Sequence, residues 1–461
     1  MTLPPSPFAD LTLSGFAARL RQGEMSAESA TATLLARIDA LQPRLRAFTY
    51  VDREGALAQA KAVDRLRAAG TDLGPLMGVP IALKDLYSVD GMPTTAGSKV
   101  DIADLVEPEG GFVTRLRRSG CVILGKTATT EFALGGFNLD TPPPWNPCDA
   151  EVARMTGGSS HGSAVAMAAG LAAFTLGTDT GGSVRWPAAL CGVVGCKTTT
   201  GHWPQDGIFP LSRQMDSIGT FTSSVADAAT IEGALAGEGE IAPAPPSSLV
   251  LALPGAHFFQ HIEDDVQRCF TQAVKLLRAA GVTIVDVPLP EAAEIDEVFG
   301  GLIAAEWLAF VGRERFLANA SRMDPVAAAR IRAGLDLKAD AYARLCTRHA
   351  ALVAQIAARA GGIDGWISPT VVTLPVPCSD VRTAEQAAAW NRLNTQNTRP
   401  GNLFGQCGIS LPMHQLGARG PAGLQLCAAP HHDRQLLATA LAVESVIGRA
   451  PPVRDVTDRA R

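Results

Sequence analysis

The sequence lacks the features that would identify a membrane, disulfide-bonded or metal-dependent protein. Its most apolar long stretch, residues 165–177, spans 13 residues, whereas a membrane helix needs about 20. The eight histidines form no HExxH or comparable metal-ligand spacing, and the nine cysteines include no CxxC pair. We therefore expect no membrane span, no metal and no cofactor, and we expect free, mostly buried thiols in a reducing compartment. Classical Ser-His-Asp chemistry is also poorly supported.

Neither the charge nor the N-terminus indicates a nucleic-acid partner, a membrane surface or secretion. The net charge of -5, with 18% charged residues, favours a small-molecule partner. Residues 1–20 contain no basic cluster before an apolar run, which predicts the absence of a signal peptide and a cytoplasmic location. The 461 residues could hold two or three domains by length alone, and 47% hydrophobic residues are ample for a core.

Hydrophobic periodicity predicts alternating helices and strands. Strands at residues 78–85 and 121–127, with a helix between them, favour an α/β sheet with both faces covered. The other predicted elements are helices over 8–41 in two pieces (the second beginning near Ser26), over 52–69 and near 224–236, a strand after the Pro-rich segment that begins at 238, an almost entirely helical region over 262–360, strand and loop at 365–377, a hairpin over 409–430 and a helix over 433–447.

Residues 157–187 combine two Gly-Ser clusters with an apolar, alanine-rich segment between them. We interpret the apolar segment as a buried helix. Glycine-rich loops next to a helix bring backbone N–H groups and hydroxyls together, and this combination suits anion binding or acyl transfer.

Lys84 is the candidate base for a serine nucleophile that has no histidine partner. A buried lysine can act as a base once desolvation keeps it neutral. Lys84 ends an apolar strand, in PIALKD, whose residues would bury its aliphatic stem. A lone lysine after a strand is more often a surface charge, so this assignment depends on the motifs around it.

Several long motifs carry a resemblance to a known family. They are LMGVPIALKD at residues 76–85, GGSSHGSA at 157–164, LGTDTGGSVRWPAALCGVVGCK at 176–197 and GLQL at 423–426. With them the sequence strongly resembles the amidase signature family, hydrolases that cleave carboxamide C–N bonds with a Ser-Ser-Lys triad.

The resemblance implies the fold and covers nearly the whole chain. We expect an α/β fold with a large, mixed, twisted sheet covered by helices on both faces. Residues 1–461 would form one domain, with a core at roughly 60–240 and 361–448 and a helical insertion or cap at roughly 262–360.

The resemblance also assigns the triad. It makes Lys84 the general base, Ser159 a bridging serine with an unusual cis peptide bond, and Ser183 the nucleophile. Intervals of 75 residues from Lys84 to Ser159 and 24 from Ser159 to Ser183 agree with the family. This spacing is the reason for choosing Ser159 over Ser160.

The chemistry of such a triad follows from its groups. Ser183 would attack a carbonyl while its proton passes through the Ser159 hydroxyl to neutral Lys84, because a hydroxyl donates and accepts at once. Removing one oxyanion-hole donor typically costs about 3–4 kcal/mol. The expected oxyanion hole consists of the backbone N–H groups of Thr180, Gly181, Gly182 and Ser183.

Four polar neighbours of the motifs have expected supporting roles. Asp179 and Arg185 could bind substrate, but a structural ion pair that holds the loop is the favoured interpretation. Ser163 is expected to cap or pack the following helix. Asp85 is expected to support the lysine loop.

The sequence departs from the family at three places. His161 stands where the family usually has glycine, and it either packs there or shapes the leaving-group side of the pocket. CKTTTGHWP at 196–204 replaces the usual LKPTxGR, which puts in doubt substrate contacts implied for that segment. The Pro-rich loop 141–147 places Trp145 before the serine motif, as an aromatic wall of the pocket or as an anchor of the loop.

Aromatic and apolar residues near the motifs indicate a roomy apolar pocket. The candidates are Phe132, Leu134, Phe137, Trp145, Met155 and Trp186, together with His161.

Two functions remain open. The leading one is a stand-alone amidase, monomeric or homodimeric, that acylates Ser183 and hydrolyses the acyl-enzyme of an amide, ester or carbamate (urethane). The alternative is the glutaminase subunit of a tRNA-dependent amidotransferase complex, which needs obligate partners and an ammonia channel. The acidic net charge and the variant 196–204 segment weigh slightly against this alternative.

Overall fold

A computed structural model describes residues 3–8 and 11–459. Residues 9 and 10, within the predicted N-terminal helical stretch, lie outside the described residues. The described part of the chain forms an 11-stranded mixed sheet in the order β1-β3-β2-β4-β6-β5-β10-β11-β9-β7-β8.

The strands, in chain order, are β1 (Phe48–Val51), β2 (Pro80–Lys84), β3 (Val122–Thr127), β4 (Phe174–Thr178), β5 (Val194–Lys197), β6 (Ile218–Thr222), β7 (Val250–Leu253), β8 (Thr283–Asp286), β9 (Gly365–Pro369), β10 (Cys407–Pro412) and β11 (Gly423–Ala428). Two parallel blocks, β3-β2-β4 and β9-β7-β8, flank an antiparallel centre.

The helices are α1 (Leu13–Arg21), α2 (Ala27–Leu45), α3 (Arg53–Ala68), α4 (Gly111–Arg118), α5 (His161–Ala168), α6 (Arg185–Cys191), α7 (Val225–Ala236), α8 (Asp264–Ala279), α9 (Ile295–Val311), α10 (Arg313–Asn319), α11 (Pro325–Arg332), α12 (Ala339–Arg359), α13 (Ala384–Thr395), α14 (Arg399–Leu403), α15 (Asp433–Ile447) and α16 (Asp455–Asp458). Short 3₁₀ turns occur at Ala103–Leu105, Glu131–Ala133, Pro246–Ser248, Ala256–Phe259, Pro290–Glu294, Cys378–Asp380 and His414–Leu416.

Helices cover both faces of the sheet, because alternate strand residues point to opposite sides. Ile81 and Leu83 of β2 join one core with residues of α1 and α4, while Ala82 joins another with α2, α3 and α5. Farther along the sheet, α6 packs on β5, β10 and β11. The other face there carries α7, α8 and α15, whose apolar residues share a core with Val194 and Ile409. The predicted mixed sheet with helices on both faces is confirmed.

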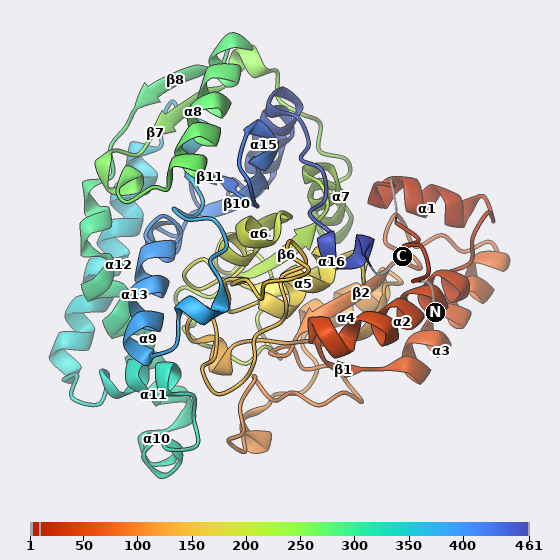
Figure 1. The fold of residues 1–461 in the computed structure, drawn as a ribbon, viewed down its shortest axis with the longest axis horizontal. Helices are drawn as coiled ribbons and strands as arrows, with labels where there is room; N and C mark the ends of the chain where they lie inside the picture. Colours follow the sequence, from red (N-terminus) through yellow and green to blue (C-terminus); the bar gives the residue numbers. More distant parts are fainter. Residues whose placement is uncertain (1–2, 9–10, 460–461) are drawn as a thin grey trace.

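The helices of the C-terminal half gather at one end of the molecule. Figure 1 shows α9, α11, α12 and α13, in cyan to blue, at the end opposite to α1, α2 and α3, in red to orange. Helices α9, α11, α12 and α14 contact one another. This group of helices stands beside the sheet and supplies one wall of the site described below.

Most predicted elements lie where periodicity placed them. Ser26 is the N-cap of α2, with its side chain accepting from the Ser29 N–H. The hairpin over 409–430 is β10 and β11, which pair antiparallel, and the last predicted helix is α15. Strands β1 and β6 were not predicted.

The predicted buried helix inside residues 157–187 is wrong in its second half. Helix α5 ends at Ala168 and Gly170 takes a left-handed conformation, with φ at 65°. Phe174–Thr178 then form β4, which pairs with β2 and β6. A short apolar run suits a buried strand as well as a buried helix, so periodicity alone could not separate them.

The region 262–360 also contains a strand. Residues 283–286 form β8, which pairs in parallel with β7 at the edge of the sheet. Helix α8, just before it, buries Val266, Phe270 and Leu277 against the sheet. The part of this region that stands away from the sheet therefore begins after β8.

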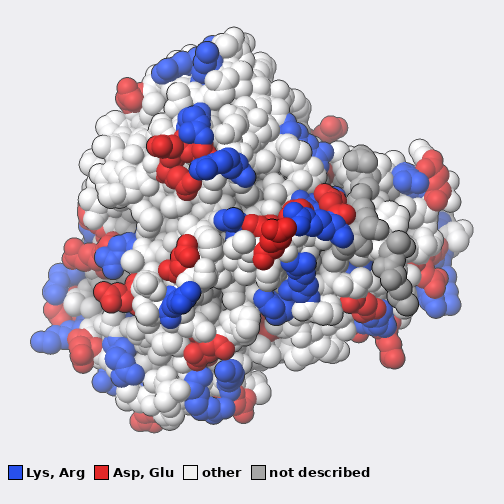
Figure 2. Space-filling model, in the orientation of Figure 1, with Lys and Arg blue, Asp and Glu red and all other residues white. Residues whose placement is uncertain are grey.

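The predictions about cysteines and membrane spans can be compared directly with the structure. All nine cysteines are free and six are buried, as expected. None of the described helices is long and apolar enough to cross a bilayer, and the described residues contain no cluster of His, Cys, Asp and Glu suited to a metal. On the face drawn in Figure 2, basic and acidic side chains are interspersed, so neither sign dominates that face.

Candidate active site

Lys84 is the last residue of β2 and its side chain is completely buried. Its Nζ lies 2.7 Å from Ser159 Oγ and 2.9 Å from Thr178 Oγ1. Burial lowers the pKa of Lys84 to about 7, although the charges of Asp216 and Asp179 act to raise it. A lysine with this pKa is neutral in about half of the molecules at pH 7, so it can accept a proton.

Ser159 and Ser160 have different surroundings although they are adjacent. The peptide bond between Gly158 and Ser159 is cis, and the Ser159 hydroxyl contacts Lys84. Ser160 Oγ instead donates to the backbone oxygen of Thr178 at 3.2 Å. The structure therefore brings Ser159, and not Ser160, into contact with the buried lysine.

Ser183 lies in the loop between β4 and α6, at the edge of a pocket. Its hydroxyl makes no hydrogen bond to any residue that the structure describes, and it lines a pocket with an empty volume of about 350 Å³. One wall of this pocket is formed by residues 133–135 and 180–186, and the other by side chains of α9, α11, α13 and α14. A free hydroxyl that faces a cavity can react with a bound molecule.

The Ser183 loop is held by the buried carboxylate of Asp179. Its Oδ1 lies 3.0 Å from Arg185 Nη2, and the carboxylate also accepts from the backbone N–H groups of Gly182 and Val184. Burial alone would raise the pKa of Asp179, but the charge and hydrogen bonds of Arg185 outweigh it and hold that pKa below its usual range. The favoured interpretation of Asp179 and Arg185 as a structural ion pair is confirmed.

This network changes the expected oxyanion hole at one residue. The Gly182 N–H already donates to Asp179 at 2.8 Å, so it is not available to a substrate. The N–H groups of Thr180, Gly181 and Ser183 have no acceptor among the described residues. The loop can therefore offer three donors rather than the four expected from the sequence.

His161 is the first residue of α5 and is 3% exposed. Burial lowers its pKa to about 3, with a further contribution from the nearby charge of Lys84, so the ring is neutral. Its Nδ1 has no hydrogen-bond partner among the described residues, and His161 is not among the residues that line the Ser183 pocket. These contacts favour packing over a direct part in the pocket wall.

The aromatic candidates divide between the pocket and the rest of the fold. Trp186 lines the Ser183 pocket and packs on Trp390, with ring centroids 4.9 Å apart. Met155 and Phe137 share a hydrophobic cluster with these two tryptophans. Trp186 is thus the candidate that directly faces the cavity beside the Ser183 hydroxyl.

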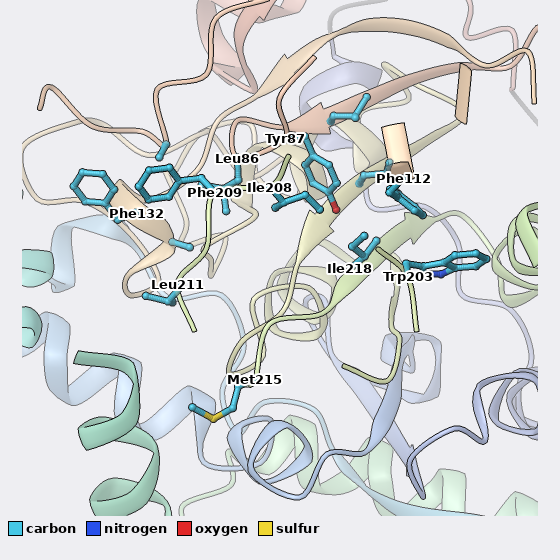
Figure 3. Packing of buried hydrophobic residues seen from close by; sticks show 14 of the residues in the cluster. Leu86, Tyr87, Phe112, Phe132, Trp203, Ile208, Phe209, Leu211, Met215 and Ile218 are labelled. Carbon is cyan, nitrogen blue, oxygen red and sulfur yellow. The ribbon is translucent and has the colours of Figure 1, made fainter. Parts of the chain in front are cut away.

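The other aromatic candidates pack elsewhere. Phe132 stacks on Phe209, with centroids 5.6 Å apart, as Figure 3 shows, and it lies in the main core with Leu134. Trp145 donates from Nε1 to the Asp149 backbone oxygen, and the Arg44 guanidinium lies 4.6 Å from its ring centroid. Trp145 therefore anchors its loop, which is one of the two roles expected for it.

Ser163 and Asp85 support the fold around the triad. Ser163 Oγ donates to the Leu176 backbone oxygen at 2.8 Å, which joins α5 to β4. Asp85 forms a buried ion pair with Lys126 at 3.2 Å and accepts from Thr95. Both findings agree with their expected roles in packing and in supporting the lysine loop.

Sequence reasoning missed several residues of the site. Thr178 is the second partner of Lys84, and Asp216 accepts from the Thr180 hydroxyl beside the triad. Asn391, Arg330 and Arg399 enter the pocket from helices of the C-terminal half. No motif marks these three residues, because an arginine or asparagine in an alanine-rich helix has the pattern of an ordinary solvated face.

Comparisons with known proteins place this geometry in a family. The family model described as Amidase matches residues 29–437. The chain is 37% identical over 449 residues to the 2-amino-5-chloromuconic acid deaminase of Comamonas testosteroni, covering 96% of this chain and 97% of that protein. It is 33% identical over 477 residues to a glutamyl-tRNA(Gln) amidotransferase component, the GatA-type polypeptide of Geobacter metallireducens, covering 94% and 97%.

A solved structure agrees with these sequence matches. The native peptide amidase from Stenotrophomonas maltophilia superposes with a TM-score of 0.82 at 27% identity, covering 98% of this chain and all of that one. The expected resemblance is therefore confirmed over nearly the whole length. The chain belongs to the amidase signature family, whose members are hydrolases that act on carbon–nitrogen bonds.

Proposed function

We propose that this protein hydrolyses carboxamide C–N bonds through an acyl-enzyme on Ser183, with Ser159 as proton relay and Lys84 as general base. The observation that carries this proposal is the 2.7 Å contact between Lys84 Nζ and Ser159 Oγ in a completely buried setting. A neutral lysine is a base strong enough to take a serine proton through a second hydroxyl.

The reaction has two halves. Ser183 Oγ forms a bond to the carbonyl carbon while its proton passes to Ser159 and the Ser159 proton passes to Lys84. The lysine ammonium then returns a proton by the same route to the leaving nitrogen, the C–N bond breaks and the amine departs. Water attacks the resulting ester with the same proton relay, which releases the acid and restores the Ser183 hydroxyl.

The Ser183 loop would stabilise the negative oxygen of both tetrahedral intermediates. The N–H groups of Thr180, Gly181 and Ser183 are the donors that the loop leaves unused. Asp179 and Arg185 hold these groups in place before substrate binds, and preorganised donors of this kind supply much of the rate enhancement in acyl transfer.

The same chemistry extends to other acyl compounds. Linear and aryl amides, esters and carbamates all present a carbonyl carbon with a leaving group, so each can acylate Ser183. The named reaction of the Comamonas relative, a deamination of 2-amino-5-chloromuconic acid, also removes nitrogen from carbon and supports a C–N bond as the target. A panel of amides, esters and carbamates, with ammonia or amine release measured directly, identifies the preferred class.

Substitution of the triad tests the proposed mechanism. Ser183→Ala and Lys84→Met should each lower kcat/KM for a p-nitroanilide by about 10³-fold or more. Ser160→Ala is the matched control, since Ser160 contacts backbone rather than Lys84, and it should retain most activity. A fluorophosphonate should add its mass to the peptide that contains Ser183. Wild-type turnover by Ser183→Ala would refute the assignment.

A second function is favoured by the likeness to amidotransferase components. The Geobacter protein matches over 94% of this chain, so the glutaminase of such a complex is the alternative. Glutaminase activity measured with and without small co-purifying partner proteins distinguishes the two. Amide hydrolysis by the purified chain alone supports the stand-alone enzyme, whereas activity that depends on partners supports the alternative.

A further inference from the structure

Arg330 brings an unpaired positive charge to the Ser183 pocket. It lies near the end of α11 and lines the pocket together with Ser183 and Asn391. Its guanidinium has no ion pair, hydrogen bond or aromatic contact with any residue that the structure describes. Burial lowers the pKa of Arg330, which is the expected cost of holding a cation away from water without a counter-charge.

Arg399 adds a second cation from another helix. It is the first residue of α14, its side chain is 13% exposed, and its guanidinium lies 5.3 Å from the ring centroid of Phe299. Burial lowers the pKa of Arg399 to about 9, with a further contribution from the nearby charge of Arg330. The two guanidinium groups thus act on each other within one cavity.

The available counter-charge lies outside the pocket. Asp296 Oδ1 is 3.4 Å from Arg399 Nη1, and its other oxygen is 3.8 Å from Arg392. Asp296 lines two outer hollows that Arg399 also lines, but it does not line the Ser183 pocket. Its side chain is 65% exposed, so water screens its charge. Arg330 therefore keeps its full need for an anion.

The remaining polar groups of the pocket wall also favour an acceptor. Asn391 Oδ1 accepts from the Gly136 N–H at 3.1 Å, which leaves Nδ2 as the free end of the amide. Asn391 Nδ2 and Trp186 Nε1 are buried and have no acceptor among the described residues. Buried donors without partners cost stability unless a ligand satisfies them.

We propose that the Ser183 pocket binds a carboxylate of the substrate between Arg330 and Arg399, so that the enzyme prefers amides that carry a carboxylate on the acyl part. A carboxylate can accept two hydrogen bonds from each guanidinium fork and from the neighbouring donors. The small cavity suits a short chain, such as the monoamide of a four- or five-carbon dicarboxylic acid. The catalytic step rests on the proposed function, whereas the binding of the carboxylate does not.

The pocket also discriminates against zwitterions. The described residues that line it include two arginines and no aspartate or glutamate, so nothing there pairs with an α-ammonium group. An ammonium beside two guanidinium groups is repelled in a low-dielectric cavity. A free amino acid such as L-glutamine should therefore bind more weakly than the same five-carbon amide without its amino group.

Calorimetric titration tests the binding separately from catalysis. The protein used is full-length Ser183→Ala, which binds ligands without turnover, and the probes are succinate and its neutral diamide succinamide. Succinate should bind at least about 10-fold more tightly than succinamide, and Arg330→Met should weaken succinate binding by about 10- to 100-fold. Arg330→Lys keeps the charge and should restore part of the affinity.

Arg332→Met is the matched control. Arg332 lies on the same helix, is exposed, and has its guanidinium 5.7 Å from the Phe316 ring centroid rather than in the pocket. Its substitution should leave succinate binding unchanged. Thermal unfolding gives a further check, because removing an unpaired buried charge with Arg330→Met should not lower the Tm of the unliganded protein.

Specific outcomes would overturn this inference. Equal affinities for succinate and succinamide, or an unchanged succinate affinity in Arg330→Met, would show that the arginines do not bind a carboxylate. L-Glutamine binding as tightly as glutaramate would refute the discrimination against zwitterions. A wild-type protein that binds succinate through Arg330 but hydrolyses no amide would contradict the proposed function and leave this inference intact.

Discussion

Asp179 and Arg185 form an ion pair with 3.0 Å between Oδ1 and Nη2, and neither side chain has any exposed surface. The arginine also contacts Gln425 and Asn402, while the aspartate holds the N–H groups of Gly182 and Val184. A pair of this kind is well compensated only while both partners are present. Its main consequence is a fixed conformation for the Ser183 loop.

Removing Arg185 should strongly destabilise the protein. Arg185→Met leaves the Asp179 carboxylate buried without a counter-charge, which typically costs about 3–5 kcal/mol. Urea denaturation followed by circular dichroism measures the change in the free energy of unfolding. Arg344→Met removes an ion pair whose side chains are 71% and 64% exposed, and this control should change stability by less than about 1 kcal/mol. Equal effects of the two substitutions would contradict the prediction.

The pH dependence of activity should report the titration of Lys84. Its pKa is lowered to about 7, and only the neutral amine can accept the serine proton. Below this pH the lysine is protonated, so kcat/KM for a neutral amide should fall as pH decreases through about 7 and level off above about 8. A pH–rate profile measures this limb. A limb near the usual lysine pKa would show that Lys84 is not the titrating base.

Asp216 should tune that limb. Its negative charge raises the pKa of Lys84, while burial raises the pKa of Asp216 itself to about 6. Asp216→Asn removes the charge, so the pKa of Lys84 should fall and the limb of the profile should move from about pH 7 toward pH 6. Because Asp216 also accepts from Thr180, kcat should decrease. Asp380→Asn, at an exposed site, is the control and should leave the profile in place.

Thiol labelling should confirm the state of the cysteines in solution. Cys148, Cys346 and Cys378 are partly exposed and the other six are buried. Burial raises the pKa of Cys148 to about 12 and that of Cys378 to about 11, so both should react slowly. Native protein should therefore label at no more than these three thiols, and protein unfolded without reductant should label at all nine. A total short by an even number would reveal a disulfide.

The sequence predicts local elements well where the periodicity of the pattern is distinctive. The amphipathic helices and the 409–430 hairpin have clear patterns, and the structure confirms them. β4 was assigned to a helix because Phe174 and Leu176 lie in an apolar run with no polar alternation. That strand is buried between β2 and β6, and burial on both faces removes the period that identifies a strand.

The site divides in the same way. The motifs identify Lys84 and Ser159, and the structure brings these two side chains into contact. The loss of the Gly182 N–H to Asp179 depends on the path of the backbone, which no pattern encodes. Arg330 and Arg399 are 69 residues apart on separate helices, and only the packing of those helices turns two ordinary charges into one cationic pocket.

The contacts of Arg185 with Asn402 and Gln425 also determine when the site can form. Lys84, Ser159 and Ser183 all lie in the first half of the chain, but the arginine that fixes the nucleophile loop has partners more than 200 residues later. A nascent chain that has emerged only through β6 carries every triad residue and still lacks these contacts. The enzyme is therefore expected to gain activity only late in its synthesis, when the C-terminal strands have joined the sheet.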